Sequence, residues 1–219
     1  MLLIHHLSSP SIILSSAFSN NYLQQIFDTL INSYIDNKIG IAENFLSDQL
    51  SSGLRDNLRK LFSTKQMKLA GTGNAALIIQ DKTVRSDRIF WLDRNHNDVF
   101  ENAFFDAMDS FVAELNSTCY SGITGYEFHY TMYDVDSFYA KHIDQFRNND
   151  SRQFSMVFYL NPDWADGDGG ELCVYHNTVQ QKVTPLNGRV VFFKSNQLPH
   201  EVLVTNKPRL SITGWLKKD

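Results

Sequence analysis

The sequence has little of what marks several large classes of protein. Its 219 residues include two cysteines, Cys119 and Cys173, too few for the disulfide framework of a small secreted scaffold. We expect both to be free, buried thiols. It also lacks a basic excess: 20 Lys and Arg face 24 Asp and Glu, for a formal net charge of -4. Nucleic-acid binders usually present a basic face, so we expect no nucleic-acid partner.

Long apolar runs are missing as well. No stretch approaches the ~20 apolar residues that a membrane-spanning helix needs, and we expect no membrane partner. The first 37 residues contain no Lys or Arg, whereas a secretory signal begins with a positively charged region. We therefore expect a cytoplasmic protein.

What is present is the composition of a globular domain, with 42% hydrophobic and 13% aromatic residues. Apolar residues recur at three and four positions from residue 21 onward, which predicts a helix. Two more helices are predicted after the capping residues Ser47-Asp48 and Asn97-Asp98. We expect one structural domain: an extension of unknown conformation at residues 1–20, supporting helices and leading strands at 21–120, and a β-rich core at 121–219.

After Gly122 the sequence pattern changes to short segments of aromatic and β-branched residues, separated by turn residues. Such closely spaced strands are typical of a β-sandwich or barrel, so the predicted class is α+β, mainly β, with helices supporting a closed or two-sheet core. The predicted strands are residues 126–133, 138–143, 154–160, 172–176, 189–194, 201–204 and 209–216.

One pair in these strands has the spacing of metal ligands. Residues two apart in a strand lie on the same face, so His142 and Asp144 can share one ion, and we choose His200 as the third ligand. Two imidazoles and one carboxylate form the facial triad of non-heme Fe(II) oxygenases. Glu127 and His129 have the same spacing, and spacing alone does not rank the two pairs. The remaining histidines are interpreted as structural or surface residues: His5, His6, His96, His129 and His176.

The last predicted strand alternates strictly, with Arg209, Ser211, Thr213 and Trp215 on one face. If that face is internal, the Arg209 guanidinium needs an anion, because an unpaired buried charge is costly. A bound dicarboxylate fits, since guanidinium matches a carboxylate with two parallel hydrogen bonds and Ser211 can add a third. An internal ion pair remains the alternative, with Glu127, Glu171 or Asp134 as its partner.

The order of these motifs resembles that of the Fe(II)- and 2-oxoglutarate-dependent prolyl 4-hydroxylase family, over roughly residues 40–217. Within it the chain is most similar to the prolyl hydroxylase domain enzymes that act on hypoxia-inducible factor, and to their bacterial relatives. Residues 85–91 match a stretch ahead of the core in that subgroup, as does the nine-residue step from His200 to Arg209. The other matching residues are Tyr133, Tyr139, His142-x-Asp144, Tyr159-Leu160-Asn161, Gly169-Gly170-Glu171-Leu172, residues 188–193, Pro199-His200-Glu201-Val202 and residues 209–215.

The resemblance implies a double-stranded β-helix, or jelly roll, and a role for each matching residue. His142, Asp144 and His200 hold iron, Arg209 binds the far carboxylate of 2-oxoglutarate, and Ser211 and Tyr133 lie beside the cosubstrate. Trp215, Asp87, Arg152 and Arg85 are expected on the substrate side. One departure is expected: Phe158 stands where the subgroup has a tyrosine that helps to bind the cosubstrate, so a hydroxyl is missing unless Ser211 replaces it.

The implied activity is 4-hydroxylation of a prolyl residue in a protein or peptide. The reaction uses Fe(II), 2-oxoglutarate and dioxygen, with L-ascorbate as reductant and succinate and CO2 as coproducts. Residues 68–85, rich in small side chains, are predicted to form a loop that closes over the peptide. Two alternatives stay open: a hydroxylase of a free amino acid or other small molecule, and a catalytically silent jelly-roll binding or oxygen-responsive module. The target protein and the oligomeric state are not identified by the sequence.

Overall fold

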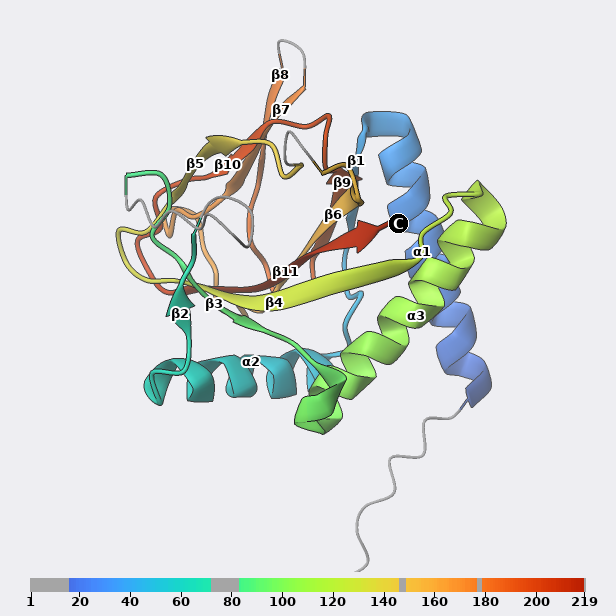
Figure 1. The fold of residues 1–219 in the computed structure, drawn as a ribbon, viewed down its shortest axis with the longest axis horizontal. Coiled ribbons are helices and arrows are strands. Elements are labelled where there is room, and N and C mark those ends of the chain that lie inside the picture. The colour runs from blue at the N-terminus through green and yellow to red at the C-terminus, as the bar shows by residue number, and fades with distance from the viewer. Residues whose placement is uncertain (1–15, 72–82, 146–148, 177–178, 219) are drawn as a thin grey trace, which may run out of the picture.

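The computed structural model describes residues 16–71, 83–145, 149–176 and 179–218. Three α-helices lie in the first part of the chain (Figure 1): α1 (Ser16–Asn37), α2 (Asp48–Ser63) and α3 (Val99–Cys119). A 3-10 turn, η1 (Arg94–His96), precedes α3. Helix α1 begins earlier than the predicted residue 21. Most of the predicted closing loop, residues 72–82, lies outside the described residues.

The starts of α2 and α3 are set by side chains that satisfy the free amide groups of a first helical turn. Ser47 accepts a hydrogen bond from the Leu50 amide, and Asp98 accepts from the amides of Phe100 and Glu101. Both starts agree with the sequence prediction. None of the helices in the described part of the chain is long and apolar enough to cross a membrane.

A seven-stranded antiparallel sheet forms the centre of the molecule. Its strands run in the order β1-β9-β6-β11-β4-β3-β2. Central strand β11 pairs with β4 on one side and with β6 on the other. The bounds are β1 (Ile39–Ala42), β2 (Lys68–Leu69), β3 (Arg88–Trp91), β4 (Gly125–Tyr133), β6 (Arg152–Tyr159), β9 (Val190–Lys194) and β11 (Arg209–Lys217).

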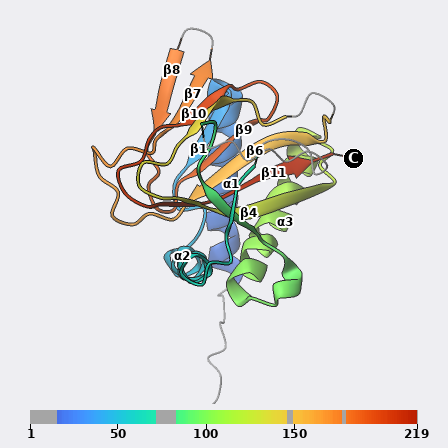
Figure 2. The ribbon, with the colours of Figure 1, turned by 60° about the vertical axis from the view of Figure 1, so that its left-hand side comes forward.

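A smaller four-stranded antiparallel sheet, in the order β5-β10-β7-β8, packs against one face of the large sheet. The two sheets form the jelly roll, and the β7–β8 hairpin stands out at one end (Figure 2). The bounds are β5 (Tyr139–His142), β7 (Leu172–His176), β8 (Val179–Val183) and β10 (His200–Val202).

Two apolar cores lie on opposite faces of the large sheet. Leu210, Ile212 and Leu216 of β11 join the outer core, which packs against the helices. The inner core lies between the sheets and includes Tyr159 and Phe193. The alternation predicted for the last strand is therefore confirmed, and Arg209 and Ser211 face the space between the sheets, where both are buried.

Both cysteines are free, as expected, but their burial differs. Cys173 is buried in β7, whereas Cys119 is exposed because it is the last residue of α3. The prediction of two buried thiols is wrong for Cys119.

Candidate active site

Three potential metal ligands meet between the two sheets. His142 ends β5, Asp144 follows two residues later, and His200 opens the neighbouring strand β10. One ligand atom from each residue lies within 4.8 Å of the other two. Within the described ranges this is the one such group of three, and neither Glu127 nor His129 belongs to it.

Hydrogen bonds fix the orientation of both imidazoles. Nδ1 of His142 lies 2.8 Å from the Ala140 carbonyl oxygen, and Nδ1 of His200 lies 2.9 Å from that of Leu198. A carbonyl oxygen only accepts, so each Nδ1 carries the hydrogen and each Nε2 presents a lone pair. The Nε2 atoms lie 3.4 and 3.6 Å from the two carboxylate oxygens of Asp144. Lone pairs therefore converge with no hydrogen between them, an arrangement that a cation stabilises.

The protonation states suit a metal site. Burial opposes ionisation of Asp144, but His200, His142 and the Ser155 hydroxyl outweigh it and hold the pKa of the carboxyl well below its usual range. Ser155 donates to Oδ2 of Asp144 at 2.6 Å. Burial lowers the pKa of His200. An ionised carboxylate beside a neutral imidazole is the form in which these side chains bind a metal.

A buried cation lies deeper in the same space. Arg209 is 1% exposed, and its Nε donates to the Gly170 carbonyl at 2.8 Å. Its Nη1 lies 3.4 Å from the Ser211 hydroxyl. No carboxylate among the described residues pairs with it, and Glu127, one of the predicted alternatives, binds Arg152 instead. The guanidinium therefore lacks an anion that the described protein could supply.

Tyr159, not Phe158, faces this arginine. The Arg209 guanidinium carbon lies 5.0 Å from the Tyr159 ring centroid and 4.9 Å from that of Tyr133. Phe158 faces the opposite way, in the core beneath the helices. The expected missing hydroxyl is thus a wrong prediction: strand alternation puts Tyr159 on the cosubstrate side. Its buried hydroxyl has no hydrogen-bond partner in the described structure.

Arg85 and Asp87 form an ion pair next to the candidate metal ligands. Nε and Nη2 of Arg85 donate to the two oxygens of the fully buried Asp87 at 2.7 and 2.6 Å. The guanidinium carbon lies 4.2 Å from the Tyr139 ring centroid, and that ring stacks on His142 with centroids 3.5 Å apart. The ion pair therefore fixes one side of an iron-ligand candidate, while substrate contact by Arg85 and Asp87 stays a prediction.

Trp215 and Arg152 lie together beside Asp144, whose backbone carbonyl accepts from Arg152 Nη1 at 3.5 Å. The Arg152 guanidinium carbon lies 3.4 Å from the Trp215 ring centroid, and Nη2 of Arg152 pairs with Oε1 of Glu127 at 2.7 Å. The indole nitrogen of Trp215 is buried without a hydrogen-bond acceptor among the described residues. Beside it, Trp91 is 44% exposed, with the two ring centroids 6.4 Å apart. This region therefore has a buried N–H donor without an acceptor, on Trp215, and it reaches solvent at Trp91.

His129, which the sequence interpretation placed among structural or surface histidines, is buried beside Trp215. The imidazole is 3% exposed and lies between Trp91 and Trp215, at centroid distances of 5.0 and 5.6 Å. Its Nδ1 is 2.9 Å from the Thr131 hydroxyl and 3.2 Å from the Tyr130 carbonyl oxygen. Burial, followed by the positive charge of Arg85, lowers the pKa of His129 to about 4. A neutral imidazole therefore packs between the two tryptophan rings. Its place follows from the pairing of Trp91 with His129 across β3 and β4.

The residues present fit Fe(II) and 2-oxoglutarate. Three converging lone-pair donors supply a cation site with open positions. A buried guanidinium without an anion, next to a tyrosyl hydroxyl without a partner, supplies a carboxylate site in the same space.

Comparison with known proteins agrees with this fit. Residues 128–217 match the model of the 2OG-Fe(II) oxygenase superfamily. This part of the chain is therefore similar to a 2OG-Fe(II) oxygenase domain, and the family's iron and 2-oxoglutarate agree with the groups that the residues present fit.

Several of the proteins similar to this chain are prolyl hydroxylases. The chain is 28% identical over 208 residues to the hypoxia-inducible factor prolyl hydroxylase of Caenorhabditis elegans, covering 88% of this chain and 28% of that protein's length. It is 29% identical to a Pseudomonas putida prolyl-4-hydroxylase structure, with a TM-score of 0.80, covering 89% of this chain and 100% of the other. A Trichoplax adhaerens prolyl hydroxylase, solved with a hypoxia-inducible factor peptide fragment, shares the fold. Its TM-score is 0.83 at 23% identity, covering 94% of each chain.

The His129→Gln variant tests whether this imidazole is neutral in the folded protein. As pH falls, the unfolded chain takes up a proton near the ordinary pKa of 6.5, while folded His129 stays neutral until about pH 4. Protonation of the unfolded state then costs the wild type roughly 2 kcal/mol of stability between pH 7 and pH 5, a loss that the Gln variant lacks. Urea unfolding of both metal-free proteins at the two pH values measures the difference, and parallel losses would contradict a neutral buried imidazole.

Proposed function

We propose that this domain hydroxylates a prolyl residue, at the 4-position, in a protein or peptide. The observation that carries the proposal is that the space between the sheets holds both a cation site of three ligands and a buried guanidinium that lacks an anion among the described residues. The likeness to the P. putida prolyl-4-hydroxylase, at 29% identity over the whole of that chain, supports proline as the target. The C. elegans relative is named for a protein substrate, which supports a peptide over a free amino acid.

In this proposal His142, Asp144 and His200 hold the iron. Arg209 binds the far carboxylate of 2-oxoglutarate, with the Tyr159 and Ser211 hydroxyls beside it and Tyr133 against the guanidinium. Iron with 2-oxoglutarate supplies the activation of dioxygen that inserts one oxygen atom into a C–H bond and releases succinate and CO2. L-ascorbate is expected to keep the metal reduced.

The protein's own part in the reaction is to position groups and to exclude water. The carbonyls of Ala140 and Leu198 keep each imidazole in the tautomer that offers Nε2, and Ser155 keeps the Asp144 carboxylate turned toward them. Tyr139 stacks on one face of His142 and closes that side to solvent. A side-chain displacement of about 1 Å in such a site can cost on the order of a hundredfold in rate.

We propose that the substrate binds against Trp215 and Arg152, with Arg85 and Asp87 near it. The unsatisfied indole N–H of Trp215 is suited to a peptide carbonyl, because a buried donor without an acceptor costs about 1–3 kcal/mol. Arg152 keeps the indole plane in place by stacking on it. The partly exposed Trp91 offers apolar contact where a peptide enters.

The Arg209→Ala variant tests the cosubstrate site. Charge-assisted hydrogen bonds contribute about 1.5–3 kcal/mol, so KM for 2-oxoglutarate should rise roughly tenfold to a hundredfold, with little change in KM for the peptide. Arg189→Ala is the matched control, since that guanidinium pairs with Glu43 at the surface. Equal KM values for 2-oxoglutarate in the two variants would exclude Arg209 from this role.

The activity itself is tested with iron, ascorbate, labelled 2-oxoglutarate and a library of proline-containing peptides. We expect labelled succinate together with peptides heavier by one oxygen atom on proline, and comparison with hydroxyproline standards should place it at C4. Asp144→Ala should lose both signals because the site loses its one carboxylate, whereas Asp36→Ala, in α1, should keep them.

The other outcomes separate the alternatives. Succinate formed with free amino acids but never with peptides would replace the proposal with a small-molecule hydroxylase. No succinate under any condition, from protein that binds iron, would favour a silent binding module.

A further inference from the structure

Two buried serines, Ser155 and Ser195, form a short chain of hydrogen bonds that ends at Asp144. Both are 0% exposed. The Ser155 hydroxyl lies 2.6 Å from Oδ2 of Asp144, and the Ser195 hydroxyl lies 3.0 Å from that of Ser155. The two serines meet because Ser155, in β6, pairs with Phe193 of β9, and Ser195 follows Phe193 by two residues. The carboxylate is thereby connected to the segment that follows β9.

The direction of both hydrogen bonds follows from the chemistry of the three groups. A carboxylate only accepts hydrogen bonds, so the one hydrogen of the Ser155 hydroxyl is donated to Asp144. The Ser155 oxygen is then left to accept from Ser195. Ser195 makes no other side-chain hydrogen bond in the part of the chain that the structure describes. Because a hydroxyl that accepts a hydrogen bond becomes a stronger donor, Ser195 strengthens the bond that holds Asp144.

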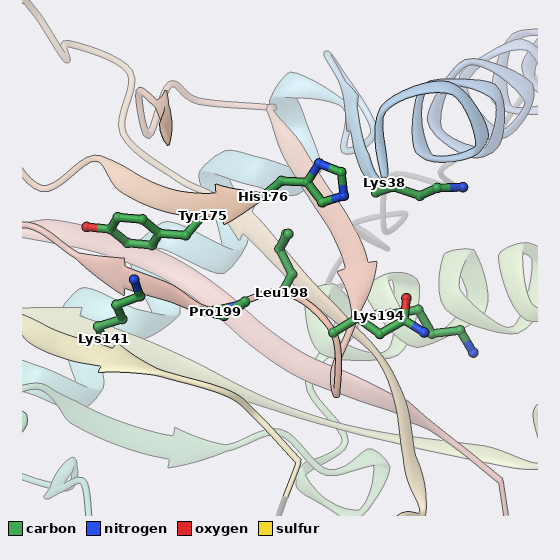
Figure 3. Close-up of a pocket in the computed structure, with 8 residues that line it drawn as sticks. Lys38, Lys141, Tyr175, His176, Lys194, Leu198 and Pro199 are labelled. Atoms are coloured by element: carbon green, nitrogen blue, oxygen red, sulfur yellow. The ribbon is translucent and has the colours of Figure 1, made fainter. Parts of the chain in front are cut away.

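The turn that begins at Ser195 also holds His200. This turn joins β9 to β10, and the Leu198 carbonyl accepts from Nδ1 of His200 at 2.9 Å. Figure 3 shows the residues on either side of the turn, Lys194 at the end of β9 and Leu198 with Pro199 before β10. Two of the three candidate ligands are therefore supported from one short segment.

The rest of the fold fixes this segment from several directions. The Ser195 amide donates to the Gln153 carbonyl of β6 at 3.1 Å, and the Pro199 carbonyl accepts from the Tyr175 amide of β7 at 2.9 Å. The Leu198 side chain, 3% exposed, belongs to the inner core. Such a support suits a metal site, whose ligands must be held within about 0.5 Å of their working positions.

We propose that Ser195 is a positioning residue for the metal site and that it acts through Ser155. Its hydroxyl orients that of Ser155 toward Asp144, and it connects this carboxylate to the turn that holds His200. Hydrogen bonds to metal ligands from outside the coordination sphere typically change metal affinity by roughly 10–100-fold. The inference deepens the proposed function and rests on its metal site.

Calorimetric titration of the metal-free protein with Co(II), a substitute for Fe(II), tests the proposal without turnover. Ser155→Ala should raise the Kd for Co(II) roughly tenfold to a hundredfold. Ser195→Ala should raise it by a smaller factor of roughly three to ten, as expected for residues of one hydrogen-bond network. The double variant should bind no more weakly than Ser155→Ala alone, because Ser195 acts through that hydroxyl.

The matched control is Ser51→Ala. Ser51 is equally buried, in α2, and its hydroxyl has no hydrogen-bond partner in the described structure. This variant should keep the wild-type Kd for Co(II). Urea unfolding of each metal-free variant measures any loss of stability separately from the change in metal affinity.

Three results would overturn the positioning role. The first is an unchanged Kd in Ser195→Ala, even if that variant is less stable. The second is a double variant whose loss is the product of the two single losses, which means that Ser195 acts independently of Ser155. The third is an equal loss in Ser51→Ala, which means general destabilisation. Absence of Co(II) binding by the folded wild type would instead overturn the metal site of the proposed function, and the positioning role with it.

Discussion

Strand β11 must satisfy two different environments at once, and the rest of the molecule follows from how it does so. One face packs into the apolar core beneath the helices through Leu210, Ile212 and Leu216. The other presents Arg209, Ser211, Thr213 and Trp215 to the space between the sheets. Because side chains alternate strictly, a shift in register by one residue would bury the polar set against the helices. The outer core therefore fixes the depth at which the guanidinium lies.

Several buried groups of the site on this strand lack a charged or hydrogen-bonding partner in the described structure. Among the described residues, Arg209 has no anion and the Tyr159 hydroxyl has no partner, while the two Nε2 atoms face a carboxylate with no hydrogen between them. Each of these is unfavourable in a buried place, and all lie between the two sheets. A ferrous ion and a keto-acid with a distal carboxylate satisfy them together, which links the stability of this region to its ligands.

Much of this was predictable from sequence because the signals are local. Ser47 and Asp98 cap helices where their side chains suggest, and the alternation from Arg209 to Trp215 identified the inner face of the last strand. Strand spacing paired His142 with Asp144, the family resemblance favoured that pair together with His200, and the structure brings the three together.

The features that the sequence did not predict depend on pairing between strands that are distant in the chain. Tyr159 and Phe158 are neighbours in sequence, and only the register of β6 against β11 shows which one reaches Arg209. His129 lies beside Trp91 because β3 pairs with β4, a contact between distant strands that no local pattern indicates.

The most direct test is an anaerobic crystal structure of the protein with iron and an unreactive analogue of 2-oxoglutarate. The account predicts a single ion bound by Nε2 of His142, Nε2 of His200 and a carboxylate oxygen of Asp144, with the far carboxylate of the analogue on the Arg209 guanidinium. An ion bound elsewhere, or an analogue whose distal carboxylate does not reach Arg209, would contradict it.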